Sequence, residues 1–135
     1  MPNACIQIPV AQRRFQQVTE AASVVVAAPF LGWVAASQTS LTAGQRAGLG
    51  ALAVIGAVGD GLLFATWPTR GCITPARRDF HLAADVFWLG VAAPFVWQTS
   101  KTAGLDGRVS LGLKVVSAAI AAIDLGLIVY GWSKR

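Results

Sequence analysis

The sequence predicts an all-α protein, an integral membrane four-helix bundle built from a tandemly duplicated two-helix hairpin. Of its 135 residues, 55% are hydrophobic and only 13% are charged, whereas a soluble domain usually has about 25% charged residues. Four apolar stretches approach the roughly 20 residues that a membrane span needs. The chain also repeats itself, because residues 15–70 align with residues 80–135 without a net gap. We expect one membrane domain, 1–135, with repeat one at 11–70 and repeat two at 76–135.

The repeat is clearest inside the first and third apolar stretches. The pentapeptide VAAPF at residues 26–30 returns at 91–95, so that Pro29 and Pro94 occupy equivalent positions. A second block, QTS-x-TAG, begins at Gln38 and again at Gln98, where the spacer before it is five residues shorter. We therefore expect the third helix to end about one turn earlier than the first. The extra residues after Gly104 should lengthen the second loop or the fourth helix.

Hydropathy and turn signals predict where the four helices lie. They are expected near residues 18–37, 47–67, 81–99 and 111–132, with turns rich in Gly, Pro and Thr between them. Pro29 and Pro94 lie within spans, where each removes a backbone hydrogen bond and favours a kink. Trp67 and Trp132 end the second and fourth spans, which is typical of the aromatic belts at membrane interfaces. The first span resembles a signal peptide, but it contains Glu20 and recurs as the third span, so we expect it to be retained.

The basic residues predict the orientation. Seven lie in the N-terminal segment, the central loop and the C-terminus: Arg13, Arg14, Arg70, Arg77, Arg78, Lys134 and Arg135. Four lie on or beside the other two loops: Arg46, Lys101, Arg108 and Lys114. The positive-inside rule then places both termini in the cytoplasm, in a multi-pass protein of the plasma (inner) membrane. The two copies would point the same way, related by a parallel pseudo-twofold axis along the membrane normal.

Charge and cysteine content limit the partners. The net charge is +5, but the bases lie beside apolar runs and form no basic stripe interleaved with aromatic residues, so the expected partner is the lipid bilayer and not a nucleic acid. Four short spans barely enclose a cavity, so we also expect a homo-oligomer or other membrane subunits.

Cys5 and Cys72 fall in segments placed in the cytoplasm, where thiols stay reduced, and a disulfide is not expected. Their role is left open.

The acidic residues are the main candidates for a functional site. Four of the six lie inside expected spans, one in each: Glu20, Asp60, Asp85 and Asp124. A charged group near the bilayer centre costs about 2.5–3.5 kcal/mol on insertion scales, so these side chains should face the bundle interior. His81, the only histidine, precedes Asp85 by four residues and shares its helix face.

Two arginines and the His81–Asp85 pair suggest proton or cation chemistry. Arg13 and Arg78 stand seven residues before Glu20 and Asp85, so each odd-numbered helix presents a base and an acid on one side. Proton exchange, cation binding and acid–base catalysis are the reactions open to such groups. The acids could instead simply pair with neighbouring arginines at the interface. No metal is expected, because carboxylate-bridged metal bundles use two Glu-x-x-His motifs. No motif identifies a cofactor.

These observations favour a binding or translocation protein with a cytoplasm-facing acidic cavity, lined by Glu20, Asp60, His81, Asp85 and Asp124, for a small ligand, a proton or a cation. Pro29 and Pro94, with Arg13 and Arg78, would support it. One alternative is a membrane-embedded acid–base enzyme, of isomerase or cyclase type, acting on an apolar substrate. The other is a structural accessory subunit of a larger membrane complex.

Overall fold

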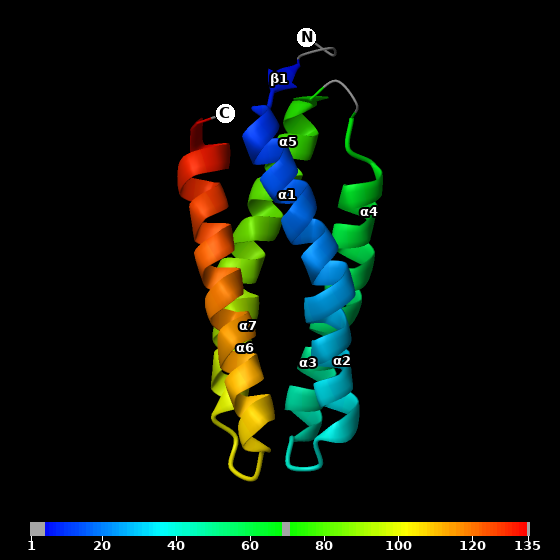
Figure 1. The fold of residues 1–135 in the computed structure, drawn as a ribbon, viewed down its shortest axis with the longest axis vertical. Coiled ribbons are helices and arrows are strands. Elements are labelled where there is room, and N and C mark those ends of the chain that lie inside the picture. Colours follow the sequence, from blue (N-terminus) through cyan, green and yellow to red (C-terminus); the bar gives the residue numbers. More distant parts are fainter. Residues whose placement is uncertain (1–4, 69–70, 135) are drawn as a thin grey trace.

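A computed structural model describes residues 5–68 and 71–134 and has four long helices side by side (Figure 1). These helices span Val10–Ser37, Ala43–Ala65, Pro75–Ser100 and Gly107–Lys134, and each is long and apolar enough to cross a membrane. The predicted all-α fold with four apolar helices is confirmed. Arg70 and Arg135, which contribute to the predicted orientation and repeat, lie outside the described residues.

Each long helix contains one π-helical segment. The first helix consists of α1 (Val10–Ala22), η1 (Ser23–Ala27) and α2 (Ala28–Ser37). The second consists of α3 (Ala43–Val54), η2 (Ile55–Asp60) and α4 (Gly61–Ala65). The third consists of α5 (Pro75–Phe87), η3 (Trp88–Ala92) and α6 (Ala93–Ser100). The fourth consists of α7 (Gly107–Gly126), η4 (Leu127–Gly131) and the 3-10 turn η5 (Trp132–Lys134).

The helices begin earlier than hydropathy predicts, because polar caps extend them beyond their apolar parts. Thr42 caps α3 in a reciprocal capping box with Gln45. Thr74 caps α5, and its side chain accepts a hydrogen bond from the backbone N–H of Arg77. Asp106 caps α7 in the same way. The expected starts at residues 47, 81 and 111 are therefore too late.

The two prolines do not interrupt their helices. Pro29 and Pro94 are each the second residue after a π-helical segment, η1 or η3. The wider π turn accommodates a residue that has no N–H to donate. The first helix ends eight residues after Pro29, at Ser37, and the third ends six residues after Pro94, at Ser100. The third helix therefore ends earlier after its proline than the first, as expected, but by two residues and not by a full turn. The reason is that Gln98 to Ser100 are helical, whereas Gln38 to Ser40 form a loop.

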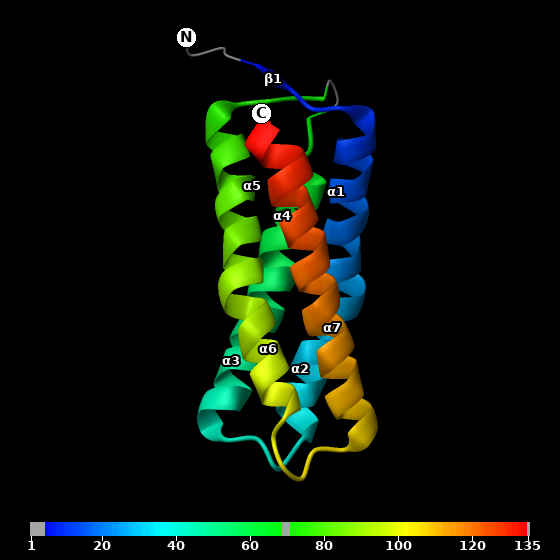
Figure 2. The same cartoon turned by 90° about the vertical axis from the view of Figure 1, so that its left-hand side faces the viewer.

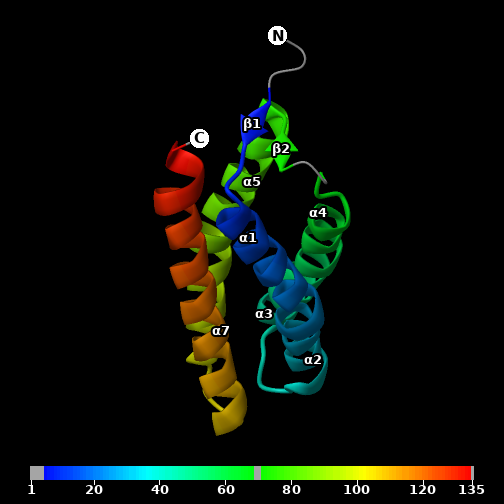
Figure 3. The same cartoon turned by 45° about the horizontal axis from the view of Figure 1, so that its top comes forward.

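The chain ends and the central connection lie at one end of the bundle. Strands β1 (Ile6–Gln7) and β2 (Cys72–Ile73) pair antiparallel there, with Ile6 opposite Ile73 (Figure 3). The turn η5 lies at the same end, while the loops after α2 and α6 lie at the other (Figures 1 and 2). We call these the terminal end and the loop end.

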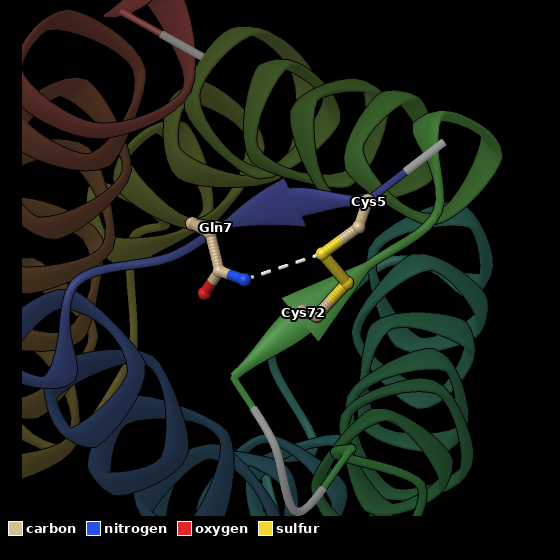
Figure 4. The surroundings of a disulfide bond; sticks show 3 residues. All are labelled: Cys5, Gln7 and Cys72. Atoms are coloured by element: carbon tan, nitrogen blue, oxygen red, sulfur yellow. Dashed lines mark hydrogen bonds between the residues drawn. A yellow bond between two sulfur atoms is a disulfide. The ribbon is translucent and has the colours of Figure 1, made fainter. Parts of the chain in front are cut away.

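The strand pair brings Cys5 and Cys72 together, and the structure joins them in a disulfide with their Cα atoms 5.4 Å apart (Figure 4). The expectation of two reduced thiols is therefore wrong. The two cysteines are 67 residues apart in sequence, and only the pairing of β1 with β2 reveals their proximity. Because disulfides persist mainly in oxidising compartments, the bond weighs against a cytoplasmic terminal end.

Two apolar clusters close the bundle. The loop-end cluster consists of Leu31, Val34, Ala35, Leu41, Leu49, Leu52, Ala92, Val96, Val109 and Leu113. The terminal-end cluster consists of Ile8, Ile73, Leu127 and Trp132. The space between them is where the polar side chains of the helices collect.

Candidate functional site

A cavity of about 410 Å³ lies between the two helical hairpins, and all five predicted site residues line it. Glu20 comes from α1, Asp60 from η2, His81 and Asp85 from α5, and Asp124 from α7. Leu31 and Leu52 of the loop-end cluster and Leu127 of the terminal-end cluster also border the cavity. Its volume is in the range of small-molecule sites in proteins.

Each of the four acids lies beside a π-helical segment. Glu20, Asp85 and Asp124 each stand three residues before one, and Asp60 is the last residue of η2. Such segments are frequent at functional sites because the extra residue in the turn changes which side chains face inward. The π-helical segments therefore lie at the same level of the bundle as the four acids.

Glu20 is held by a tryptophan from the second helix. Its side chain is buried, and Oε2 accepts a hydrogen bond of 2.7 Å from Nε1 of Trp67. Its other oxygen, Oε1, is buried without a hydrogen-bond partner and lies 3.9 Å from Nδ1 of His81. One carboxyl oxygen is thus fixed and the other is available.

His81 lies between two indole rings. The ring centroids of Trp67 and Trp132 are 5.1 and 4.9 Å from that of His81, with nearly parallel planes. Nε of Arg77 donates to Nε2 of His81 at 3.2 Å, so Nε2 acts as the acceptor. A neutral His81 ring then has its proton on Nδ1, which faces the side chains of Gln16, at 3.4 Å, and Glu20. Glu20, and not the predicted Asp85, is therefore the acid that pairs with His81 in the described part of the chain.

Asp85 and Asp124 form a carboxyl pair. Both are buried, their carboxyl groups are close enough to interact, and the indole of Trp132 lies beside Asp85. Two neighbouring carboxyl groups avoid like-charge repulsion when one of them has a proton. Oδ2 of Asp85 is buried and has no hydrogen-bond partner. Asp60 is less buried, and its side chain lies beside the hydroxyl of Ser23.

Arg77, which was not predicted, is an arginine that contacts the described site residues. Besides donating to His81, Arg77 donates to the backbone oxygens of Thr66 and Leu63, and its guanidinium lies 4.9 Å from the ring centroid of Trp67. Arg78 instead pairs with the exposed Asp79 at 2.7 Å.

The other predicted supporting residues are not among the described residues that border the cavity. Arg13 lies near Gly71 at the terminal end, where a Cβ on that glycine would be 3.4 Å from Nη1. Pro29 and Pro94 begin the helical segments on the loop side of η1 and η3 and are not among the residues bordering the cavity.

Sequence analysis misses the tryptophans. Trp67 and Trp132 recur at equivalent positions of the repeat, and this recurrence could have marked them as site residues. Tryptophans of an aromatic belt also occur near helix ends, so the sequence pattern does not separate the two roles. Among the described residues, no group of three or more His, Cys, Asp or Glu side chains is arranged to hold a metal ion. The site therefore consists of carboxyl groups, one imidazole and two indoles.

Comparison of the chain with protein-family models, with curated proteins and with solved structures finds no match. Function must accordingly be inferred from the cavity and its side chains.

Proposed function

We propose that this chain is a small polytopic membrane protein whose acidic intramembrane cavity binds, and in a transport cycle translocates, a small cationic ligand or a proton. The observation that carries the proposal is the convergence of Glu20, Asp60, Asp85 and Asp124 on one cavity. No Lys or Arg is among the described residues that border it. Because uncompensated carboxylates are costly inside a bilayer, a cation in the cavity would offset that cost.

We further infer that the two hairpins are duplicates that run parallel and are related by an approximate twofold axis along the bundle. Equivalent residues have similar neighbours in support of this, although Nε1 of Trp132 has no hydrogen-bond partner among the described residues. Trp67 donates to Glu20, and Trp132 lies beside Asp85, the counterpart of Glu20 in the second copy. A ligand near this axis would be contacted by one acid from each copy. Transport would then require one hairpin to rock against the other, as in other repeat-built transporters.

The Cys5–Cys72 disulfide favours an oxidising compartment at the terminal end. Against it, the base count of seven to four favours a location in the plasma (inner) membrane with a cytoplasmic terminal end, and this is the orientation that we propose. The cavity, which is bordered by the terminal-end cluster, would then be gated from the cytoplasm. A second copy or other membrane subunits would complete the enclosure of so small a bundle.

A membrane-embedded acid–base enzyme is the second candidate. The neighbouring carboxyl groups of Asp85 and Asp124, together with the Nδ1 side of His81 facing Glu20, support it. Such a pair can deliver a proton to an apolar substrate and remove one elsewhere on it.

Native mass spectrometry of the purified protein in detergent tests the binding proposal. We expect the wild type to retain a small molecule with a basic group. Asp85→Asn should reduce the bound fraction at least tenfold. The matched control is Asp79→Asn, which removes the same charge from a side chain that is 65% exposed and outside the cavity.

The outcomes separate the three functions. Loss of the ligand in Asp85→Asn alone supports the binding proposal, and equal occupancy in both variants overturns it. Conversion of the retained molecule to a product of different mass by the wild type favours the enzyme. A wild type without any ligand, whose copurified protein subunit dissociates in Asp85→Asn, establishes the accessory role instead.

A further inference from the structure

The cavity opens sideways between the first and fourth helices. Several residues that border it are also exposed on the outside of the bundle: Val18 at 66%, Val26 at 61% and Val115 at 59%. Val18 and Val26 lie eight residues apart on the first helix and so share one face. Val115 is on α7, which lies next to the first helix (Figures 1 and 2). These valines mark a rim, which we call the side portal.

Apolar side chains border the cavity toward both ends of the bundle, with Leu31 and Leu52 toward the loop end and Leu127 toward the terminal end. The loop-end cluster and the terminal-end cluster lie on either side of the cavity along the bundle axis, and both are packed from apolar side chains. With the four helices across a bilayer, the side portal faces lipid hydrocarbon. A ligand that uses it must therefore be soluble in the membrane.

The cavity itself has two kinds of lining. Most of its residues are apolar, among them Trp88, Ile120 and Leu31. Its polar part offers two buried oxygens without partners, Oε1 of Glu20 and Oδ2 of Asp85, which are 3% and 5% exposed as residues. Both oxygens are acceptors from carboxyl groups, and they come from the two different hairpins.

We propose that the ligand is a membrane-dissolved primary amine with an apolar tail, an inference that rests on the proposed binding function. The amine enters through the side portal. A protonated primary amine is compact, positively charged and has three N–H donors, which suits two carboxyl acceptors. Its tail would occupy the apolar part of the cavity and the portal. A quaternary ammonium has the charge but no donor, and a short amine has the donors but no tail.

Decylamine binding to the protein in phosphatidylcholine nanodiscs tests the ligand class, with the change in tryptophan fluorescence as the signal and empty nanodiscs as the blank. We expect decylamine to bind at least tenfold more tightly than decyltrimethylammonium. Methylamine should not compete at a hundredfold excess. Equal affinity for decylamine and decyltrimethylammonium would overturn the assignment of a primary amine.

Stopped-flow rates test the route. Val18→Phe and Val115→Phe should slow decylamine association at least fivefold, whereas Val115→Ala should accelerate it. The control Val54→Phe changes a residue of the second helix that is similarly exposed, at 63%, but does not border the cavity. Because the Phe and Ala variants act in opposite directions, misfolding of one cannot imitate the expected pattern.

The failures are distinguishable. Unchanged rates with an Asp85-dependent decylamine affinity would overturn the side portal and leave the acidic site intact. Absence of decylamine binding, with another Asp85-dependent ligand retained in native mass spectra, would overturn the amine and leave the proposed function intact. Absence of both would overturn the proposed function as well.

Discussion

The two halves of the bundle are packed by opposite means. At the loop end, each hairpin inserts a phenylalanine against a glycine of the other: a Cβ on Gly48 would lie 2.3 Å from Phe95, and one on Gly112 would lie 2.7 Å from Phe30. In the terminal half, His81 is stacked between two tryptophans and the carboxyl groups border a cavity. The loop half thus holds the hairpins together, and the terminal half leaves room between them.

The difference follows from what drives association inside a membrane. Apolar side chains gain no hydrophobic free energy when they leave lipid to contact one another. Close contact between helices therefore depends on small residues, which allow tight packing, and on polar pairs. The loop half uses the first device and the terminal half uses the second. A protein that must both stay assembled and hold a ligand can separate the two tasks in this way.

The largest expected effect is at the loop end. Gly48→Ala forces a methyl group into the ring of Phe95, and overpacking of this kind costs about 1–3 kcal/mol. We expect a corresponding fall in the free energy of unfolding, measured by SDS titration of the protein in mixed micelles. Phe95→Leu in the same chain should restore most of it.

The matched control is Gly50→Ala on the same helix, where a Cβ would meet nothing within 4 Å. It should be neutral or slightly stabilising, since alanine favours a helix over glycine. If Gly50→Ala and Gly48→Ala destabilise equally, the phenylalanine–glycine contacts are not what holds the hairpins together.

A loss of stability of similar size is expected from a polar contact in the terminal half. Trp67→Phe keeps a ring next to His81 but removes the 2.7 Å hydrogen bond to Glu20. Leaving a buried acceptor unsatisfied costs about 1–3 kcal/mol. Trp33→Phe, at a residue that is 54% exposed, is the control. Equal unfolding curves for the two variants would show that Trp67 does not hold Glu20.

The next prediction concerns the orientation of the protein in the membrane, which is tested by the labelling of its two cysteines and not by its stability. The base count predicts that a membrane-impermeant maleimide will label neither Cys5 nor Cys72 in intact cells, even after treatment with an impermeant reductant. Labelling that appears only after the reductant would contradict the cytoplasmic terminal end. It would agree with the Cys5–Cys72 disulfide of the structure, which needs an oxidising compartment.

Much of the fold was predictable from sequence, because hydropathy and the repeat are local or regular signals. The ends of the four helices were expected within two residues, but their starts were predicted four to eight residues too late, in part because of polar first turns such as the one that Thr42 caps. The cost of placing charge in a membrane was enough to suggest that all five site residues face inward. That argument needs only position along a helix.

The partners within the site were not predictable in the same way. The Cys5–Cys72 disulfide and the contact of Gln16 with His81 join residues that are far apart in sequence. Arg77 and Arg78 are adjacent on α5 and point in different directions around the helix axis. Which of them reaches His81 therefore depends on how α5 is rotated about that axis. Such choices are decided by packing between the hairpins, which no pattern within one hairpin records.

Four carboxyl groups that share a cavity open to the bilayer should react with a membrane-soluble carbodiimide, and this labelling is the most direct test of the site. Dicyclohexylcarbodiimide dissolves in membranes and forms a stable adduct with a protonated carboxyl group, which peptide mass spectrometry locates. We expect adducts on the cavity acids, chiefly the Asp85–Asp124 pair, and not on the exposed Asp79; decylamine should protect the pair. Adducts on Asp79 alone, or adducts on the four acids that decylamine does not reduce, would contradict this arrangement.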